Sequence, residues 1–461
     1  MKRIPRSIWI LVAIGVLLRL GSFAWVASHA GEGAIISGDG QTYAEVARNL
    51  AAGNGFMIEE NGKLIPEVFR APGESLLLAP FLFFPYGYIW WGIFLSIVAG
   101  VLLPVLVYCI GKRIGNEQAA IIAATLVTLE PHLVWFSWTA MSEMPATLLL
   151  LGALALAIHS WGKNPWLGVG GVGLLLGAAV LVRPPFLPIA LAVLTAVGIW
   201  FAIRRRLKYC LYAVVVGVVL LSTTVPWSVR NYYVTGTYAV SGMGWYNLYF
   251  DYLSSLDALT NKTSFIQEKT ERENNPPPGV VRGETLNPTS APALKSAALA
   301  ELAQKWQLVL KFEPVFLFSY FTHDGYYQYA RSFGFIGEAG EPASSSTTFA
   351  VLSQGEGRFK VLFNALKAQY FIPLIGRGFA ALIVVLALIG VWYKRREPMV
   401  YMLALTIALS AVVATTIGLG VEARLRVPME PLLFLLAGIG VCGLLSRYRG
   451  KTEISSHHSS S

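Results

Sequence analysis

The chain carries little charge: Asp, Glu, Lys and Arg make up only 13% of its 461 residues, whereas hydrophobic residues make up 55%. Its mean hydropathy is +0.57. This composition excludes an ordinary soluble protein, because such proteins carry about twice that share of charged residues. We therefore expect the lipid bilayer to be the main solvent of the chain.

Cysteine is also scarce, since only Cys109, Cys210 and Cys442 occur, each in or at the end of an apolar run. Their spacing excludes a disulfide framework and a cysteine metal site, so they are interpreted as small buried hydrophobic residues. No ligand cluster with metal spacing is visible elsewhere. No cofactor is predicted, and a divalent metal stays an open alternative.

Basic residues exceed acidic ones, giving a formal net charge of +10. Lys and Arg concentrate just beyond the apolar runs, where they interact with anionic lipid headgroups and determine how the spans are inserted. The excess of basic residues is explained in this way, so no nucleic-acid partner is expected. The basic N-terminus precedes an apolar run that is long and lacks a clear cleavage site. It is interpreted as a retained first span rather than a signal peptide.

Apolar runs long enough to cross a bilayer recur along the chain and predict an all-α polytopic membrane protein. The ten expected spans are 8–26, 89–110, 119–136, 144–159, 166–181, 186–203, 209–226, 371–393, 399–417 and 428–445. The segment 308–321 is left open as a re-entrant piece or a short extra span, which would give eleven or twelve helices.

Basic clusters decide the expected orientation. If the N-terminus is cytoplasmic, strict alternation places five further clusters on the same side: 112–113, Lys163, 204–208, 394–396 and 447–451. This agreement predicts cytoplasmic N- and C-termini in a plasma or inner membrane, with the long loops exported. The exported loops hold most of the remaining charge.

The same alternation suggests the domain organisation. Residues 1–240 form a transmembrane module with a first exported loop at 28–88, and 241–370 form a large exported segment. C-terminal helices follow at 371–450, and 451–461 form a disordered tail. Within the first loop, residues 41–50 have helical periodicity and predict a short amphipathic helix on the membrane surface, followed by an irregular segment.

Two carboxylates at exported helix ends are candidate catalytic groups. Asp39 lies between Gly38 and Gly40, on a backbone that allows close approach to a reactant. Glu143 begins the fourth expected span. The plainer alternatives are a solvated loop residue for Asp39 and a helix cap or dipole partner for Glu143.

Arginines occur at the same exported ends, where the positive-inside tendency should deplete them. Arg70 precedes a rigid Pro-Gly turn and suits a phosphate through paired donors. The further candidates for a buried anionic headgroup are Arg183, Arg230, Arg424 and Arg426. Snorkelling, salt bridges or generic phospholipid contact are the plainer alternatives.

Weaker features complete the set. His323 and Asp324 are candidates for metal binding, with no functional role as the alternative. Arg19 in the first span is expected to extend its guanidinium to the membrane surface, that is, to snorkel. The glycines at 168–173 have the letters of a dinucleotide fingerprint, but they begin a span without a preceding strand. They are interpreted as helix-packing positions.

Taken in order, these motifs resemble the GT-C superfamily of polyprenyl-phosphate-sugar-dependent glycosyltransferases, most nearly the protein-mannosyltransferase and aminoarabinose-transferase branch. The residues that carry the resemblance are Asp39 with Tyr43 and Ala47, Arg70-Ala-Pro-Gly, Ser142-Glu-Met-Pro, Arg183-Pro and Glu422-Ala-Arg-Leu-Arg. The resemblance covers about the first 240 residues and returns before the last helix.

The resemblance implies an inverting transfer of a sugar to an acceptor hydroxyl. In that reading Asp39 activates the hydroxyl, Glu143 is the second acid, and Arg70 contacts the donor phosphate, with Tyr43 and Glu422 as secondary candidates. Protein mannosyltransferases often carry an acidic pair where this chain has Asp39-Gly40, which weakens the case for a protein acceptor. A glycan or lipid acceptor stays open.

Two rival functions stay open at this stage. A transporter or flippase of lipid-linked anionic substrates would need polar residues near the bilayer midplane, whereas the predicted spans are nearly free of charge there. A non-enzymatic envelope scaffold would not need Asp39 or Glu143.

Overall fold

The computed structural model describes residues 4–30, 32–36, 38–60, 62–80, 87–160, 165–281, 289–323, 325–335, 368–420 and 423–458. Side chains are not described at 32–33, 87–91, 368–370, 373 and 449–458. Asp324 and Glu422, both named as site candidates from the sequence, lie outside these residues.

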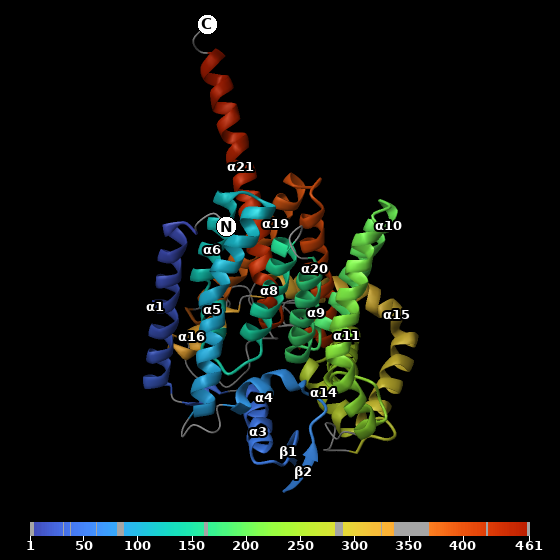
Figure 1. The fold of residues 1–461 in the computed structure, drawn as a ribbon. Coiled ribbons are helices and arrows are strands. Elements are labelled where there is room, and N and C mark those ends of the chain that lie inside the picture. The colour runs from blue at the N-terminus through green and yellow to red at the C-terminus, as the bar shows by residue number, and fades with distance from the viewer. Residues whose placement is uncertain are drawn as a thin grey trace.

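Long helices run side by side through most of the molecule (Figure 1). They are α1 (Arg6–His29), α5 (Gly87–Ile114), α8 (Glu143–Ser160), α9 (Pro165–Val182), α10 (Phe186–Ile203), α11 (Leu207–Thr235), α19 (Ala368–Tyr393), α20 (Pro398–Ala414) and α21 (Glu430–His458). Their apolar composition, with exposed Leu, Ile, Val and Trp along their outer faces, suits contact with lipid rather than water.

Within the described ranges, nine helices are long and apolar enough to span a membrane. They correspond to nine of the ten expected spans. The remaining one, expected at 119–136, is divided into α6 (Glu117–Leu129) and α7 (Pro131–Phe136). The break falls where Pro131 follows an extended Glu130, because a proline disfavours the helical conformation of the residue before it.

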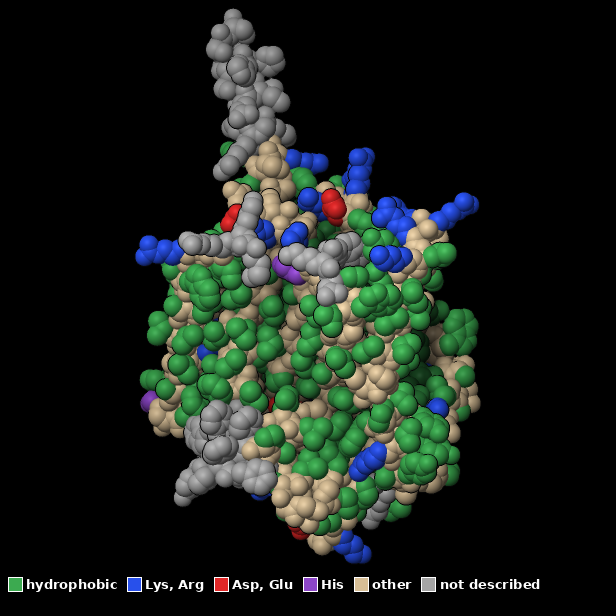
Figure 2. Space-filling view, viewed as in Figure 1, with side chains coloured by type: hydrophobic (Ala, Val, Ile, Leu, Met, Phe, Trp, Pro, Cys, Tyr) green, Lys and Arg blue, Asp and Glu red, His purple; other side chains and the backbone are tan. Residues whose placement is uncertain are grey.

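The two ends of the bundle differ in charge. Helices α5, α10 and α19 end next to Lys112–Arg113, Arg204–Arg206 and Lys394–Arg396, and these ends lie at the same side of the molecule as the N-terminus. Figure 2 shows Lys and Arg side chains gathered at this end, above a largely hydrophobic flank. We refer to this as the basic end. These three clusters thus share one side, as the alternation of spans predicts, whereas Lys163 lies outside the described residues.

The opposite end carries the first long loop. It contains α2 (Glu32–Ile35), α3 (Asp39–Ala51), a hairpin of β1 (Met57–Glu60) and β2 (Lys63–Pro66), and α4 (Pro72–Leu78). The predicted amphipathic helix is confirmed as α3, whose apolar face buries Tyr43, Val46 and Ala47. The segment expected to be irregular instead pairs as a two-stranded antiparallel sheet, a local exception to the all-α prediction.

The segment after α11 forms a compact helical group at that same end. It contains α12 (Met243–Tyr246), the π-helix η2 (Asn247–Tyr252), α13 (Leu253–Asn261), α14 (Phe265–Asn274) and α15 (Ser290–Thr322). The segment 308–321, left open between re-entrant piece and extra span, lies within the continuous 33-residue helix α15. Its core includes Phe250, Leu253 and Phe316. Further along, α16 (Tyr326–Ser332) packs on α7 and α19.

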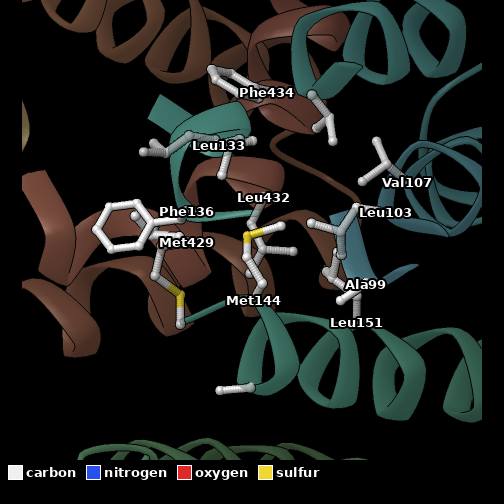
Figure 3. Packing of buried hydrophobic residues seen from close by; sticks show 14 of the residues in the cluster. Ala99, Leu103, Val107, Leu133, Phe136, Met144, Leu151, Met429, Leu432 and Phe434 are labelled. Carbon is white, nitrogen blue, oxygen red and sulfur yellow. The ribbon is translucent and has the colours of Figure 1, made fainter. Parts of the chain in front are cut away.

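The main core joins helices that are distant in sequence. Figure 3 shows one cluster that contains Leu103 of α5, Phe136 of α7, Met144 of α8 and Leu432 of α21. Met429 belongs to the same cluster. Met429 ends the 3-10 helix η4 (Ala423–Met429), which follows the 3-10 helix η3 (Thr415–Gly420). This packing fixes the start of α8 against η4, so the first residues of both are held close together.

Arg19 does not snorkel, as the sequence suggested. Its side chain is fully buried, and it donates hydrogen bonds to Ser137 Oγ at 3.0 Å and to the carbonyl oxygens of Gly15 and Thr128 at 3.3 and 3.4 Å. The break between α6 and α7 leaves polar groups near Arg19 that replace water around the guanidinium. At the C-terminus, α21 continues to His458, over most of the expected tail.

Small residues allow the closest helix contacts. The glycines at 168–173 lie in α9, where a Cβ atom on Gly173 would come within 2.6 Å of Val219 in α11, as expected for helix packing. Between α19 and α21, a Cβ atom on Gly390 would lie 2.0 Å from the carbonyl oxygen of Leu436, and one on Gly440 2.1 Å from that of Leu386. These backbones touch directly.

We predict that Gly440→Ala lowers the melting temperature of the detergent-solubilised protein by at least about 4 °C, because the added methyl group must push α21 away from α19. Gly378→Ala is the matched control, since a Cβ atom there meets nothing within 4 Å. It should leave the melting temperature unchanged or raise it slightly. Equal effects of the two substitutions would contradict this packing.

Candidate functional site

The candidate residues come from five separate elements that meet at the end of the bundle opposite the basic end. Asp39 begins α3, Arg70 precedes α4, and Glu143 begins α8. Arg183 follows α9, and Arg424 lies in η4. Each residue sits at a helix end or in a short 3-10 helix, where the backbone changes direction and a side chain can point inward.

Arg424 joins the two carboxylates. Its Nη2 atom donates to Asp39 Oδ2 at 2.5 Å, and its Nε atom donates to Glu143 Oε1 at 2.5 Å. These are charge-assisted hydrogen bonds, which are the strong class. One guanidinium from near the C-terminus therefore joins the start of α3 to the start of α8.

Two further arginines complete the network. Arg70 Nη2 donates to Asp39 Oδ1 at 2.6 Å, so each oxygen of Asp39 accepts from a different guanidinium. Arg183 Nη1 donates to Glu143 Oε1 at 2.6 Å. We call Asp39, Arg70, Glu143, Arg183 and Arg424 the ion network.

Burial differs across the ion network. The side chain of Glu143 is fully buried, whereas those of Asp39 and Arg424 are 25% and 26% exposed. The Asp39 side therefore faces the exterior and the Glu143 side faces the protein. A ligand that approaches from outside meets Asp39, Arg70 and Arg424 first.

The charge of Asp39 is fixed by its neighbours. Burial raises the pKa of Asp39, but the positive charges of Arg424 and Arg70 outweigh burial and lower the pKa to about 2. Tyr43 stands one turn further along α3, and burial together with the charge of Asp39 raises the pKa of its hydroxyl to about 12. At neutral pH Asp39 is thus ionised and Tyr43 is a neutral donor.

Glycines allow the elements to approach. Gly38 has a φ of 55°, which favours glycine directly before Asp39. A Cβ atom on Gly40 would lie 2.6 Å from the carbonyl oxygen of Ala140, two residues before Ser142. The Gly-Asp-Gly pattern therefore brings α3 against the turn that leads into Glu143.

Glu67 and Glu74 are two buried acids that no sequence pattern indicated. Glu67 Oε1 accepts from the backbone N–H groups of Phe69 and Arg70 at 2.5 and 2.6 Å, which fixes the turn that presents Arg70. Glu74 lies in the first turn of α4 and is 2% exposed. Their burial follows from the packing of α4, which a single sequence does not reveal.

Arg230 and Arg426 lie outside the ion network. Arg230 Nη1 and Nη2 donate to the carbonyl oxygens of Glu67 and Phe56 at 2.6 and 3.1 Å, which ties the hairpin to α11. Arg426 bonds Glu430 at 3.2 Å and the carbonyl oxygen of Tyr320 at 2.7 Å. Both guanidiniums are thus engaged in holding neighbouring segments.

His323 is buried at the end of α15, and its carbonyl oxygen accepts from Arg426. Among the described residues, no group of three or more His, Cys, Asp or Glu side chains could hold a metal ion. Asp39 and Glu143 are each bound by two guanidiniums rather than facing each other.

Residues 81–229 match the family model described as dolichyl-phosphate-mannose-protein mannosyltransferase. That segment contains Glu143 and Arg183, whereas Asp39, Arg70 and Arg424 lie outside it. Comparison with curated proteins gives no match.

Several solved structures are similar to this chain. The Archaeoglobus fulgidus oligosaccharyltransferase with Zn and sulfate aligns over 98% of this chain and 51% of that one, at 15% identity and a TM-score of 0.50. AglB of the same organism, with an inhibitory peptide and a dolichol-phosphate, gives the same coverage and identity and a TM-score of 0.51. ArnT from Cupriavidus metallidurans bound to undecaprenyl phosphate aligns over 95% and 78%, at 15% identity and a TM-score of 0.40.

The chain spans about half the length of the archaeal proteins. Their likeness confirms the predicted fold class, a helical membrane protein of the GT-C type. The resemblance expected from the sequence is confirmed as well, because residues 81–229 of this integral multi-pass membrane protein match the family model described as dolichyl-phosphate-mannose-protein mannosyltransferase.

Proposed function

We propose that the protein is an inverting glycosyltransferase, which moves a sugar from a polyprenyl-phosphate donor to an acceptor hydroxyl at the extracytoplasmic face. The observation that carries the proposal is the bridge made by Arg424 between Asp39 and Glu143. It brings a carboxylate that can accept a proton together with guanidiniums that can bind a phosphate.

The charges of the ion network suit an anionic ligand. Three guanidiniums stand against two carboxylates, which leaves an excess of one positive charge. Arg70 and Arg424 are the partly exposed cations, at 19% and 26%. A phosphate at the Asp39 side would accept hydrogen bonds from both, in the paired geometry that arginine favours.

The reaction then follows from the two kinds of group. The acceptor oxygen attacks C1 of the sugar and forms a new bond, while the bond from C1 to the phosphate oxygen breaks. The electron pair of that bond stays on the phosphate, whose growing charge the arginines stabilise. The hydroxyl proton passes to Asp39, and attack opposite the leaving phosphate inverts the sugar carbon.

Arg70 and Arg424 hold Asp39 in a weakly basic form, because each of its two oxygens accepts a hydrogen bond from one of them. A donor phosphate would compete with Asp39 for Arg70 and Arg424. Losing either partner raises the pKa of Asp39, since burial alone acts in that direction. Donor binding therefore makes Asp39 a better proton acceptor at the moment when the acceptor hydroxyl is needed.

The position of the ion network supports a lipid-linked donor. It lies at the bundle end opposite the basic end, which the positive-inside rule assigns to the exterior, with both termini in the cytoplasm. A polyprenyl tail can stay in the bilayer there, because each buried CH₂ contributes about 0.8 kcal/mol. The archaeal oligosaccharyltransferase of the same fold has been solved with dolichol-phosphate, a lipid of this class.

We predict that Asp39→Asn lowers turnover by at least about 100-fold, because an amide cannot accept the hydroxyl proton. Purified protein would be incubated with polyprenyl-phosphate mannose, glucose and aminoarabinose together with envelope glycolipid acceptors, and released polyprenyl phosphate would be measured. Asp251→Asn is the matched control. Asp251 forms an ion pair with Lys269, with 2.7 Å between Oδ1 and Nζ, and does not belong to the ion network. Unchanged release of polyprenyl phosphate by Asp39→Asn would contradict the proposed reaction. Movement of the lipid across the membrane without release of polyprenyl phosphate would also contradict it and would indicate a flippase.

A second prediction concerns the phosphate. Arg70→Gln and Arg424→Gln should each weaken binding of polyprenyl phosphate by about tenfold, because each removes a charge-assisted hydrogen bond. Binding to the detergent-solubilised full chain would be measured at two salt concentrations. Lys305→Gln is the control, because it removes a cation of α15 that does not belong to the ion network. Lys305 donates a hydrogen bond to Glu301 at 2.6 Å, and its replacement should leave binding of polyprenyl phosphate unchanged. Equal affinities of all variants would place the phosphate elsewhere.

A third prediction follows from the pKa of Asp39. Its value of about 2 lies below the ordinary 3.8, so Asp39 stays ionised in the free protein from pH 8 down to pH 4. The acid limb of kcat/KM, which reports the free enzyme, should therefore lie below pH 4 in the wild type. Arg424→Gln removes the largest lowering influence and should move that limb to higher pH. An identical limb in both proteins would show that Asp39 is not the base.

A further inference from the structure

A second buried acid adjoins the ion network without joining it. Glu74 is 2% exposed, and its Oε2 atom has no hydrogen-bond partner among the described residues. Leaving a buried polar atom unpaired costs free energy that an apolar residue of similar size would avoid. A carboxyl group at this position therefore points to a ligand.

The packing of α4 places Glu74 beside the site. A Cβ atom on Gly73 would lie 2.7 Å from the carbonyl oxygen of Leu181, two residues before Arg183. Arg70 stands at the other side, just before α4 begins. Glu74 is thus held between the segments that supply two of the guanidiniums of the ion network.

Glu143 offers the complementary group. Its Oε1 atom accepts from Arg183 and Arg424, whereas its buried Oε2 atom has no hydrogen-bond partner in the described part of the chain. Glu74 and Glu143 therefore each present one unsatisfied carboxyl oxygen. Both oxygens belong to residues at the start of a helix, on the same end of the bundle.

The two acids differ in protonation. Burial, followed by the negative charge of Glu143, raises the pKa of Glu74 to about 8, so Glu74 is a neutral carboxylic acid at pH 7. Helix α4 packs on α3, α5 and α9. The ionisable groups of α3 are Asp39, Tyr43, Glu45 and Arg48, and Arg70 and Arg183 lie just before α4 and just after α9. The described ionisable side chains of α5, which are Tyr108, Cys109, Lys112 and Arg113, lie toward the basic end. Glu74 can thus donate a hydrogen bond where Glu143 accepts one.

We propose that Glu74 and the second oxygen of Glu143 together bind one sugar hydroxyl of a substrate. A hydroxyl is both donor and acceptor, so it can donate to the Glu143 carboxylate and accept from the Glu74 acid. The inference rests on the proposed function, whose donor and acceptor both offer hydroxyls. Glu74 acts here as a specificity-determining residue and takes no part in the proton transfer to Asp39.

The test compares two lipids that differ only in the sugar, polyprenyl-phosphate mannose and polyprenyl phosphate, bound to the full-length protein. Glu74→Leu should weaken binding of the mannose lipid by about 5- to 20-fold, the loss expected for a buried hydrogen bond, and leave binding of the bare phosphate unchanged. Glu74→Gln keeps a neutral donor and should retain most of the affinity. Glu59→Gln, at an exposed carboxylate of β1, is the matched control.

The pH dependence provides a readout that a purely structural role would not give. In the wild type, affinity for the mannose lipid should fall as the pH rises through about 8, because ionised Glu74 can no longer donate. Glu74→Gln should remove this fall. Equal losses of both lipids in Glu74→Leu would overturn the inference. A pH profile that Glu74→Gln leaves unchanged, both for donor affinity and for the KM of the acceptor, would overturn it as well.

The remaining outcomes show whether the hydroxyl belongs to the donor or to the acceptor. They also distinguish failure of this inference from failure of the proposed function. If donor binding is unchanged in Glu74→Leu but the KM of the acceptor rises, the hydroxyl belongs to the acceptor. If the KM is unchanged as well, the inference is overturned while the proposed function stands. If neither lipid binds the wild-type protein, the proposed function fails and this inference fails with it.

Discussion

The ion pairs of Arg424 are the interaction on which the arrangement of this site depends. Arg424 is 385 residues from Asp39 and 281 from Glu143 in the chain, yet it bonds both carboxylates. Two carboxylates and three guanidiniums in a partly buried place would each be costly alone. Together they satisfy one another, and the long core helices keep them at hydrogen-bond distance.

The core explains why this network can form. Met144 of α8 and Met429 of η4 belong to the same buried cluster, so the segments that carry Glu143 and Arg424 are fixed by apolar packing. Gly40 and Gly73 let α3 and α4 approach backbone atoms of the bundle directly. Hydrophobic packing and small residues thus set the positions, and the charges then select the geometry within them.

A division of roles among similar residues follows from this geometry. Arg70 and Arg424 donate to the partly exposed carboxylate of Asp39, whereas Arg230 and Arg426 donate to backbone carbonyl oxygens, and Arg426 also to Glu430. The acids divide in the same way. Asp39 is held ionised by cations, and Glu74 is held neutral by burial and by the charge of Glu143. One place therefore combines an ionised carboxylate, several guanidiniums and a neutral carboxylic acid.

The sequence by itself determined the membrane class, nearly all spans and the shared side of the basic clusters, because each depends on local composition and on the length needed to cross a bilayer. It also indicated Asp39, Glu143, Arg70, Arg183 and Arg424 through short motifs at exported ends. Only the tertiary structure decided which arginine meets which carboxylate, the burial of Arg19 and Glu74, the break before Pro131 and the hairpin at Met57–Pro66. These depend on contacts between distant segments, and no local pattern in a single chain encodes them.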